Sequence, residues 1–218
     1  MQEIWNVLSL GGPTAIPLMI ASIFSLAVII EKTVFFARNK QNNKNLIRKV
    51  EMMIDEGDTM SAYNQLKGKK GPNVKLLSTA LSNLDEDPER IREALQVTGQ
   101  NEIRKMEKHL TILDVIAMIA PLLGLLGTVL GIISSFNILG GAAGVGDPAQ
   151  ISAGIASALI STAIGLIIAI PTAIFYSYFS KIVDRRAHQL NQSIVEIMDV
   201  VDGNDRGEKY EENVKNIS

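Results

Sequence analysis

Three long stretches without a charged residue constrain what this chain can fold into. They cover residues 4–30, 115–146 and 151–180, which are 27, 32 and 30 positions long. About 20 apolar residues in a helix suffice to cross a bilayer, and burying three such stretches would take a soluble domain far larger than 218 residues. We therefore expect an all-α integral membrane protein with three transmembrane helices. The first residues lack the basic segment of a secretory signal peptide, so we expect the first span to be retained.

The distribution of lysine and arginine predicts the orientation in the membrane. Of the 21 basic residues, 14 lie between Ala37 and Thr111 and six lie beyond Ser180, whereas the segment 140–150 has none. Loops rich in basic residues stay on the cytoplasmic side. We therefore expect a cytoplasmic loop and tail, with the N-terminus and the glycine-rich turn outside. A net charge of −2 without a basic stripe excludes nucleic acid as the main partner.

These patterns divide the chain into eight expected segments. They are a periplasmic N-terminus (1–12), a first span (13–36), a cytoplasmic helical loop (37–111), a second span (112–139), a short periplasmic turn (140–150), a third span (151–180), a cytoplasmic helical extension (181–202) and a flexible tail (203–218).

Two very long helices are expected from the start and stop signals. Asp87-Pro88 and Asp147-Pro148 each combine an N-cap residue with proline at the first helical position. No strong stop follows before Gly140 in the first case and about Gly203 in the second, so each helix would exceed 50 residues, or about 75 Å. Both helices carry apolar stripes outside the membrane, which we expect to meet within or between subunits. The stripe on the second helix is a heptad seam of Val183, Ala187, Leu190, Ile194, Ile197 and Val201.

The second and third spans match each other layer by layer when counted from the outer turn. Thr128 and Thr162 each lie 11 residues from the outer end of their span, about 16 Å deep and near the middle of a core about 30 Å thick. Ser134 and Ser157 form a shallower layer. Pro121 and Pro171 form a deeper one, where we expect helix kinks.

Small residues line one side of each of these two spans. On the second span they are Gly124, Thr128, Gly131 and Ser135, with Gly127 beside them, and on the third they are Gly154, Ala158, Ser161 and Gly165, with Ser157 and Thr162 beside them. Small residues let helix backbones approach closely in lipid. A tight helix contact, in which each hydroxyl bonds its own i−4 carbonyl, explains the pattern as well as a polar pore lining does. Both interpretations stay open on this pattern alone.

The middle of each span also lacks any group that could hold and release a proton. Glu31, Lys32 and Asp114 all fall near the expected cytoplasmic ends. Proton relays in membranes need titratable side chains, so this chain alone is not expected to be a proton pump.

The two strings APLLGLLGTVLGIISSF and GIASALISTAIGLIIAIPTAIFYSYF, with three spans and a large cytoplasmic loop, resemble the TolQ/ExbB branch of the MotA/TolQ/ExbB proton-channel family. The resemblance implies an ion-driven motor in the bacterial inner membrane. A homopentamer would enclose a pore lined by spans two and three. The pore would hold the single membrane helices of an ExbD/TolR-like dimer, and a TonB- or TolA-like protein would be a further partner.

The resemblance also implies roles for particular residues. Thr128 and Thr162 match the pore threonines that face an aspartate of the partner, and Ser134, Ser157 and Ser161 are further candidates for the pore lining. Proton flow past the aspartate would drive work at the periplasm or outer membrane, such as TonB-dependent import. In this chain Ser157 replaces the glutamate that is common in the GIAEAL string of the family, so no role of that glutamate carries over.

Two other classes of function are alternatives to the motor. A non-conducting scaffold that anchors a periplasmic protein would share every packing feature. A membrane enzyme has little support, because His109 and His188 are isolated and no catalytic or metal-ligand spacing is present. We therefore expect no catalytic residues, metal or cofactor. Hydroxyl-lined pores suit proton and sodium alike, and we take the proton as the expected ion.

Overall fold

The computed structural model describes residues 12–38, 44–139 and 148–215, and all of its regular secondary structure in these ranges is helical. The helices, in chain order, are η1 (Gly12–Thr14), α2 (Ala15–Arg38), α3 (Lys44–Asp55), α4 (Thr59–Leu66), α5 (Pro72–Ser82), α6 (Pro88–Glu107), α7 (Leu110–Leu139) and α8 (Pro148–Lys215). Three helical stretches are long and apolar enough to cross a membrane, and their most apolar windows are only 28%, 17% and 22% buried. The predicted all-α fold with three spans is confirmed.

The chain divides into two compact units. One contains residues 1–35 and 109–180 and is called here the membrane unit, whereas the other contains residues 36–108 and 181–218 and is called the polar unit. Helix α8 contributes its first half to the membrane unit and its second half to the polar unit.

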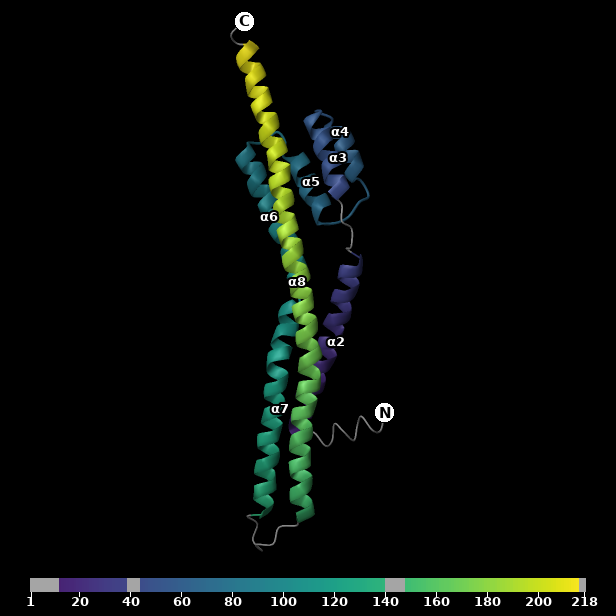
Figure 1. Ribbon diagram of the computed structural model, residues 1–218, viewed down its shortest axis with the longest axis vertical. Helices are drawn as coiled ribbons and strands as arrows, with labels where there is room; N and C mark the ends of the chain where they lie inside the picture. The colour runs from purple at the N-terminus through teal and green to yellow at the C-terminus, as the bar shows by residue number, and fades with distance from the viewer. Residues whose placement is uncertain (1–11, 39–43, 140–147, 216–218) are drawn as a thin grey trace. The chain divides into compact units, whose positions relative to one another are not determined.

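In the membrane unit, α2 packs on a pair formed by α7 and the first half of α8 (Figure 1). Leu18 of α2, Ala120 of α7 and Ala169 of α8 form its small buried core, with Leu123, Ile164 and Ile168 packed against it. Since lipid is as apolar as leucine, a large hydrophobic core is not needed to hold these helices together. Close packing and hydrogen bonds between helices have to do so.

The helix predicted from Pro88 to Gly140 is interrupted at Lys108 and His109, which separate α6 from α7. His109 has a φ of 66°, a left-handed conformation that costs a residue with a Cβ about 1–2 kcal/mol. Its Nδ1 lies 2.8 Å from Oε2 of Glu31, 78 residues away. When the imidazole is protonated, this exposed ion pair offsets part of the cost. No local pattern in the sequence predicts the pair. Helix α6 does begin at Pro88 after Asp87, as predicted.

The expected end of the last helix near Gly203 is also wrong, since α8 continues to Lys215. A Cβ on Gly203 would meet nothing within 4 Å. A glycine in an open helical position costs only about 1 kcal/mol, and the glutamate and lysine residues beyond it favour a helix.

In the polar unit, the apolar stripes of α6 and α8 meet within one chain. Five of the six seam residues of α8 are buried, and on α6 so are Ile91, Leu95 and Met106. A Cβ on Gly99 would lie 3.0 Å from Cδ1 of Ile194, and Arg92 lies 3.5 Å from Asp202. The heptad pattern therefore serves intrachain packing in this unit.

A buried carboxylate joins α5 to α6 in the polar unit. The side chain of Glu102 is 11% exposed, and its Oε1 accepts hydrogen bonds of 2.6 Å from both Lys75 and Lys105. Burial raises the pKa of Glu102, but the hydrogen bonds from Lys105 and Lys75 outweigh it, so that the pKa lies below its ordinary value of 4.5.

Glu102 should therefore make the stability of the chain depend on pH. A carboxylate whose pKa is depressed by folding stabilises the folded state above its unfolded pKa and loses this contribution as the pH falls through its folded pKa. We expect Glu102→Gln to cost about 1 kcal/mol at pH 7 and less at pH 3, where more of the carboxylate is protonated. Thermal unfolding of the full chain in detergent, followed by circular dichroism at both pH values, measures this. An equal loss at both would contradict the ion-pair explanation.

Candidate functional site

The two predicted threonines contact each other between α7 and α8. The hydroxyls of Thr128 and Thr162 are hydrogen-bonded to each other. Thr128 Oγ1 also lies 3.2 Å from the carbonyl oxygen of Gly124 and 3.3 Å from that of Ala158, and Thr162 Oγ1 lies 3.0 Å from the Gly124 oxygen. Only Thr128 thus contacts its own i−4 carbonyl, while Thr162 reaches across to α7. The threonine pair cross-links the two helices.

The glycines of the two spans lie where α7 and α8 touch. A Cβ on Gly124 would lie 3.0 Å from the backbone oxygen of Ser161, and a Cβ on Gly165 would lie 2.6 Å from that of Ala120. A Cβ on Gly131 would lie 2.8 Å from the Cβ of Ala158. Gly154 similarly abuts the side chain of Ser135. At Gly124, Gly131 and Gly165 a larger residue would meet backbone or Cβ atoms of the other helix and separate the two helices, whereas at Gly154 it would meet the hydroxyl of Ser135.

Helix α2 and η1 cover one side of the α7–α8 pair. Thr14 Oγ1 and Ser161 Cβ each lie 2.5 Å from where a Cβ on Gly127 would be, so the side of the pair that carries Gly127 and Ser161 faces η1. Thr128 and Thr162 each follow one of these residues and are therefore rotated by about 100° around their helices. The threonine pair lies on the side that α2 leaves uncovered, where both residues are partly exposed.

The predicted serines lie in different places from the threonines. Ser161 is only 2% exposed and contacts the backbone oxygen of Ser157 at 3.2 Å. Ser157 Oγ itself lies 4.0 Å from the Cβ position of Gly12. Both serines thus belong to the side covered by η1, and we leave them out of the proposed pore lining. Ser134 is exposed, and Ser135 is buried with its hydroxyl 3.0 Å from the Gly131 oxygen.

The uncovered side is not lined by small residues alone. The glycines face the neighbouring helix of the same chain, whereas Leu125, Leu159 and Leu166, one turn from the threonines, are 57%, 63% and 43% exposed. The threonine pair is thus a polar layer between leucines. Pro121 and Pro171 lie inside uninterrupted helices, and the kinks expected there stay a prediction.

The depth of the threonine pair depends on which end of the span it is counted from. Glu31 and His109 form an ion pair at the charged end of the membrane unit, and Thr128 is 19 residues from His109, about 28 Å along a helix. This distance nearly equals the thickness of the bilayer core. Helix α7, with 30 residues, is longer than that core requires. The predicted central depth therefore holds only for the count from residues 139 and 151, whereas the count from the Glu31–His109 pair places the threonines nearer the opposite end of the spans.

Two polar contacts of the membrane unit were not predicted from the sequence. One is the Glu31–His109 pair, and the other is a hydrogen bond of 2.7 Å between the buried hydroxyls of Ser25 and Thr172. A hydroxyl inside an apolar helix was the available signal for the second contact. Its partner is 147 residues away, so no local pattern could identify it.

Residues 68–192 match the model of the family described as the MotA/TolQ/ExbB proton channel family. This region is more than half of the chain and includes both threonines. The chain belongs to this family. The predicted resemblance, including its ExbB-like branch, is confirmed.

Named relatives support the assignment. An ExbB-like biopolymer transport protein of Synechocystis is 31% identical over 78% of this chain and 81% of its own length. The biopolymer transport protein ExbB of Salmonella typhimurium is 27% identical over 76% of this chain and 71% of its own length. The Tol-Pal system protein TolQ of Pseudomonas aeruginosa is 42% identical over 43% of this chain and 42% of its own length.

Membership of the MotA/TolQ/ExbB family, together with three apolar helices, makes the chain a multi-pass inner-membrane subunit of the channel type. The matched region begins in the polar unit and runs through α6 and α7 well into α8. The family assignment therefore rests on both units and on the helices that carry the threonine pair.

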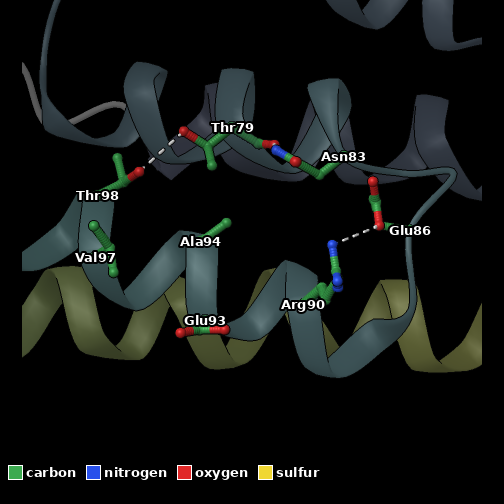
Figure 2. A pocket seen from close by; sticks show the side chains of 8 residues that line it. All are labelled: Thr79, Asn83, Glu86, Arg90, Glu93, Ala94, Val97 and Thr98. Carbon is green, nitrogen blue, oxygen red and sulfur yellow. Dashed lines mark hydrogen bonds and ion pairs between the residues drawn. The ribbon is translucent and has the colours of Figure 1, made fainter.

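A groove of about 540 Å³ lies between α5 and α6 (Figure 2). Arg90 lies 3.6 Å from Glu86 along one edge, and the hydroxyls of Thr79 and Thr98 lie 3.2 Å apart at the other. Asn83 donates to the backbone oxygen of Thr79 at 2.7 Å. These polar groups bond each other rather than converging on a common point, so we assign no ligand to the groove.

Proposed function

We propose that this chain is the pore-forming subunit of an ion-driven motor in the bacterial inner membrane. In this proposal five copies surround the membrane helices of an ExbD/TolR-like dimer, and protons pass between the copies and that partner. The motor would couple the proton motive force to work at the periplasm or outer membrane, such as TonB-dependent import. The predicted orientation, with the N-terminus outside and the polar unit in the cytoplasm, is part of the proposal.

The observation that carries the proposal is the threonine pair on the uncovered side of α7 and α8. A ring of copies with α2 outermost would turn this side inward, so that each copy contributes Thr128 and Thr162 to a polar layer. The sequence contains no titratable residue near this layer. The group that takes up and releases the proton must then come from another polypeptide, and a membrane aspartate of the partner fits this need.

The energy available per step is consistent with such a layer. One proton crossing 100 mV releases about 2.3 kcal/mol. This suffices to break one or two hydroxyl contacts between helices, each worth about 0.6 to 1.7 kcal/mol. It does not suffice to separate the glycine contacts that hold α7 against α8. The α7–α8 pair is therefore a rigid wall, and the motion belongs to the partner.

The proposal is tested by reconstituting the full chain in liposomes with and without a single-span partner of the ExbD/TolR type. Under an imposed membrane potential, we expect proton uptake, followed by an internal pH dye, only when both proteins are present. Changing the membrane aspartate of the partner to asparagine should abolish it. Native mass spectrometry of the same complex gives the stoichiometry.

Binding of the partner without any ion flux would contradict the motor and support the scaffold. Flux that follows a sodium gradient and not a proton gradient would change the ion and leave the architecture of the proposal intact.

A further inference from the structure

Buried hydroxyls of the segment η1–α2 and of α8 lie at two levels of the membrane unit. At one level lie Thr14 and Ser161, which are 3% and 2% exposed, and at the other lie Ser25 and Thr172, which are 5% and 1% exposed. The two levels are 11 residues apart on both sides of the contact. Eleven residues make about three helical turns, so both levels lie on the same face of α8, and α2 and α8 run parallel.

The bond between Ser25 and Thr172 has a direction. Thr172 Oγ1 donates its hydrogen to the backbone oxygen of Ile168 at 2.7 Å. A hydroxyl has one hydrogen and two lone pairs. Ser25 must therefore be the donor in the 2.7 Å contact with Thr172. Removing the hydroxyl of either residue removes this bond, whereas a serine at position 172 keeps the acceptor.

The exposed apolar side chains of α8 contribute little to fixing its rotation about its own axis. Exposed side chains such as Leu159 and Ile167, which are 63% and 69% exposed, would contact lipid or other apolar side chains in many orientations. Lipid is as apolar as these residues, so rotating them past it changes the free energy little. Polar contacts between helices and close packing are left to decide the orientation.

The orientation decides which hydroxyl faces the uncovered side. Ser161 and Thr162 are adjacent and thus about 100° apart around α8, so a rotation by one residue would exchange them. We propose that Ser25 and Thr172 are positioning residues, whose bond holds α8 against α2 so that Thr162, and not Ser161, faces the ion pathway. This inference rests on the proposed function for the existence of the pathway.

The absence of cysteine from the sequence permits a clean test. Single variants Ser161→Cys and Thr162→Cys of the full chain, together with its partner in membrane vesicles, are labelled with a small charged thiol reagent. We expect position 162 to react faster than position 161. Adding Ser25→Ala or Thr172→Val should lower the ratio of the two rates by about threefold to twentyfold, the range that the loss of one interhelical hydroxyl bond in lipid supports.

Two matched variants separate positioning from general damage. Thr172→Ser keeps the acceptor and should restore the ratio. Thr33→Val removes an exposed hydroxyl of α2 that bonds only the carbonyl of Ile29 in its own helix, at 2.7 Å, and should leave the ratio unchanged. Because Ser25→Ala and Thr172→Val break the same bond from opposite ends, either one suffices if the other does not accumulate.

The possible failures are distinguishable. If position 162 reacts faster but the ratio is the same with and without the Ser25–Thr172 bond, the positioning inference is overturned and the proposed function stands. If the two positions react equally with that bond intact, Thr162 does not face a water-accessible pathway, and both proposals fail.

Discussion

Gly165→Ala is expected to lower the free energy of unfolding of the membrane unit by about 1–3 kcal/mol, the usual cost of overpacking. The added Cβ would lie 2.6 Å from the backbone oxygen of Ala120 and 3.1 Å from the Cα of Gly124. Backbone atoms in a packed helix cannot rotate away as a side chain can, so α7 and α8 would have to separate. This would also strain the threonine pair, one turn away.

The matched control lies in the same helix. A Cβ on Gly203 would meet nothing within 4 Å, and alanine is favoured over glycine in a helix by about 1 kcal/mol, so Gly203→Ala should be neutral or slightly stabilising. Thermal unfolding in detergent and the amount of protein in the membrane measure both variants. If both substitutions had the same effect, the close contact at Gly165 would not limit the packing of these helices.

The double variant Thr128→Val and Thr162→Val is expected to lower proton flux with the partner by about tenfold or more, since an apolar ring excludes water from a narrow pathway. Valine keeps nearly the shape of threonine, so the glycine contacts between α7 and α8 stay in place. The loss of the mutual hydroxyl bond should cost only about 0.6 to 1.7 kcal/mol of stability. Flux should therefore fall while assembly persists.

The measurement is proton uptake by liposomes that contain the variant and its partner, with native mass spectrometry to show that the complex is intact. Thr128→Ser and Thr162→Ser retain the hydroxyls and should recover most of the flux. Undiminished flux in the double valine variant, with the complex intact, would show that the threonine pair is not part of the ion pathway.

Much of the fold could be predicted from local patterns in the sequence. The length of each uncharged stretch predicts the three spans, because the thickness of the bilayer, and not another part of the chain, sets the length that a span needs. The start of α6 at Pro88 after Asp87 likewise depends on neighbouring residues. The helix ends were harder to predict: His109, between α6 and α7, contacts Glu31, which is 78 residues away in the chain, and α8 continues past Gly203.

The sequence likewise predicts one part of the candidate site and not the other. Counting from the outer turn pairs Thr128 with Thr162, since two antiparallel helices of equal rise must bring equally distant residues together, and the two hydroxyls do meet. The counting cannot tell which side of the pair α2 covers. Because η1 and α2 cover the side that carries Ser161, this serine is buried, whereas the neighbouring Thr162 is partly exposed.

The sequence by itself thus determined that the chain has three membrane spans, where small residues gather and which hydroxyls share a depth, because helical rise and bilayer thickness act on each segment separately. Only the tertiary structure decided how α2 rests on α7 and α8, where the helix breaks at His109 and which hydroxyls stay uncovered. In a membrane these outcomes depend on a few contacts, such as the one between Ser25 and Thr172. Such contacts join residues far apart in the chain, and lipid, being as apolar as the helices, does not favour one orientation over another.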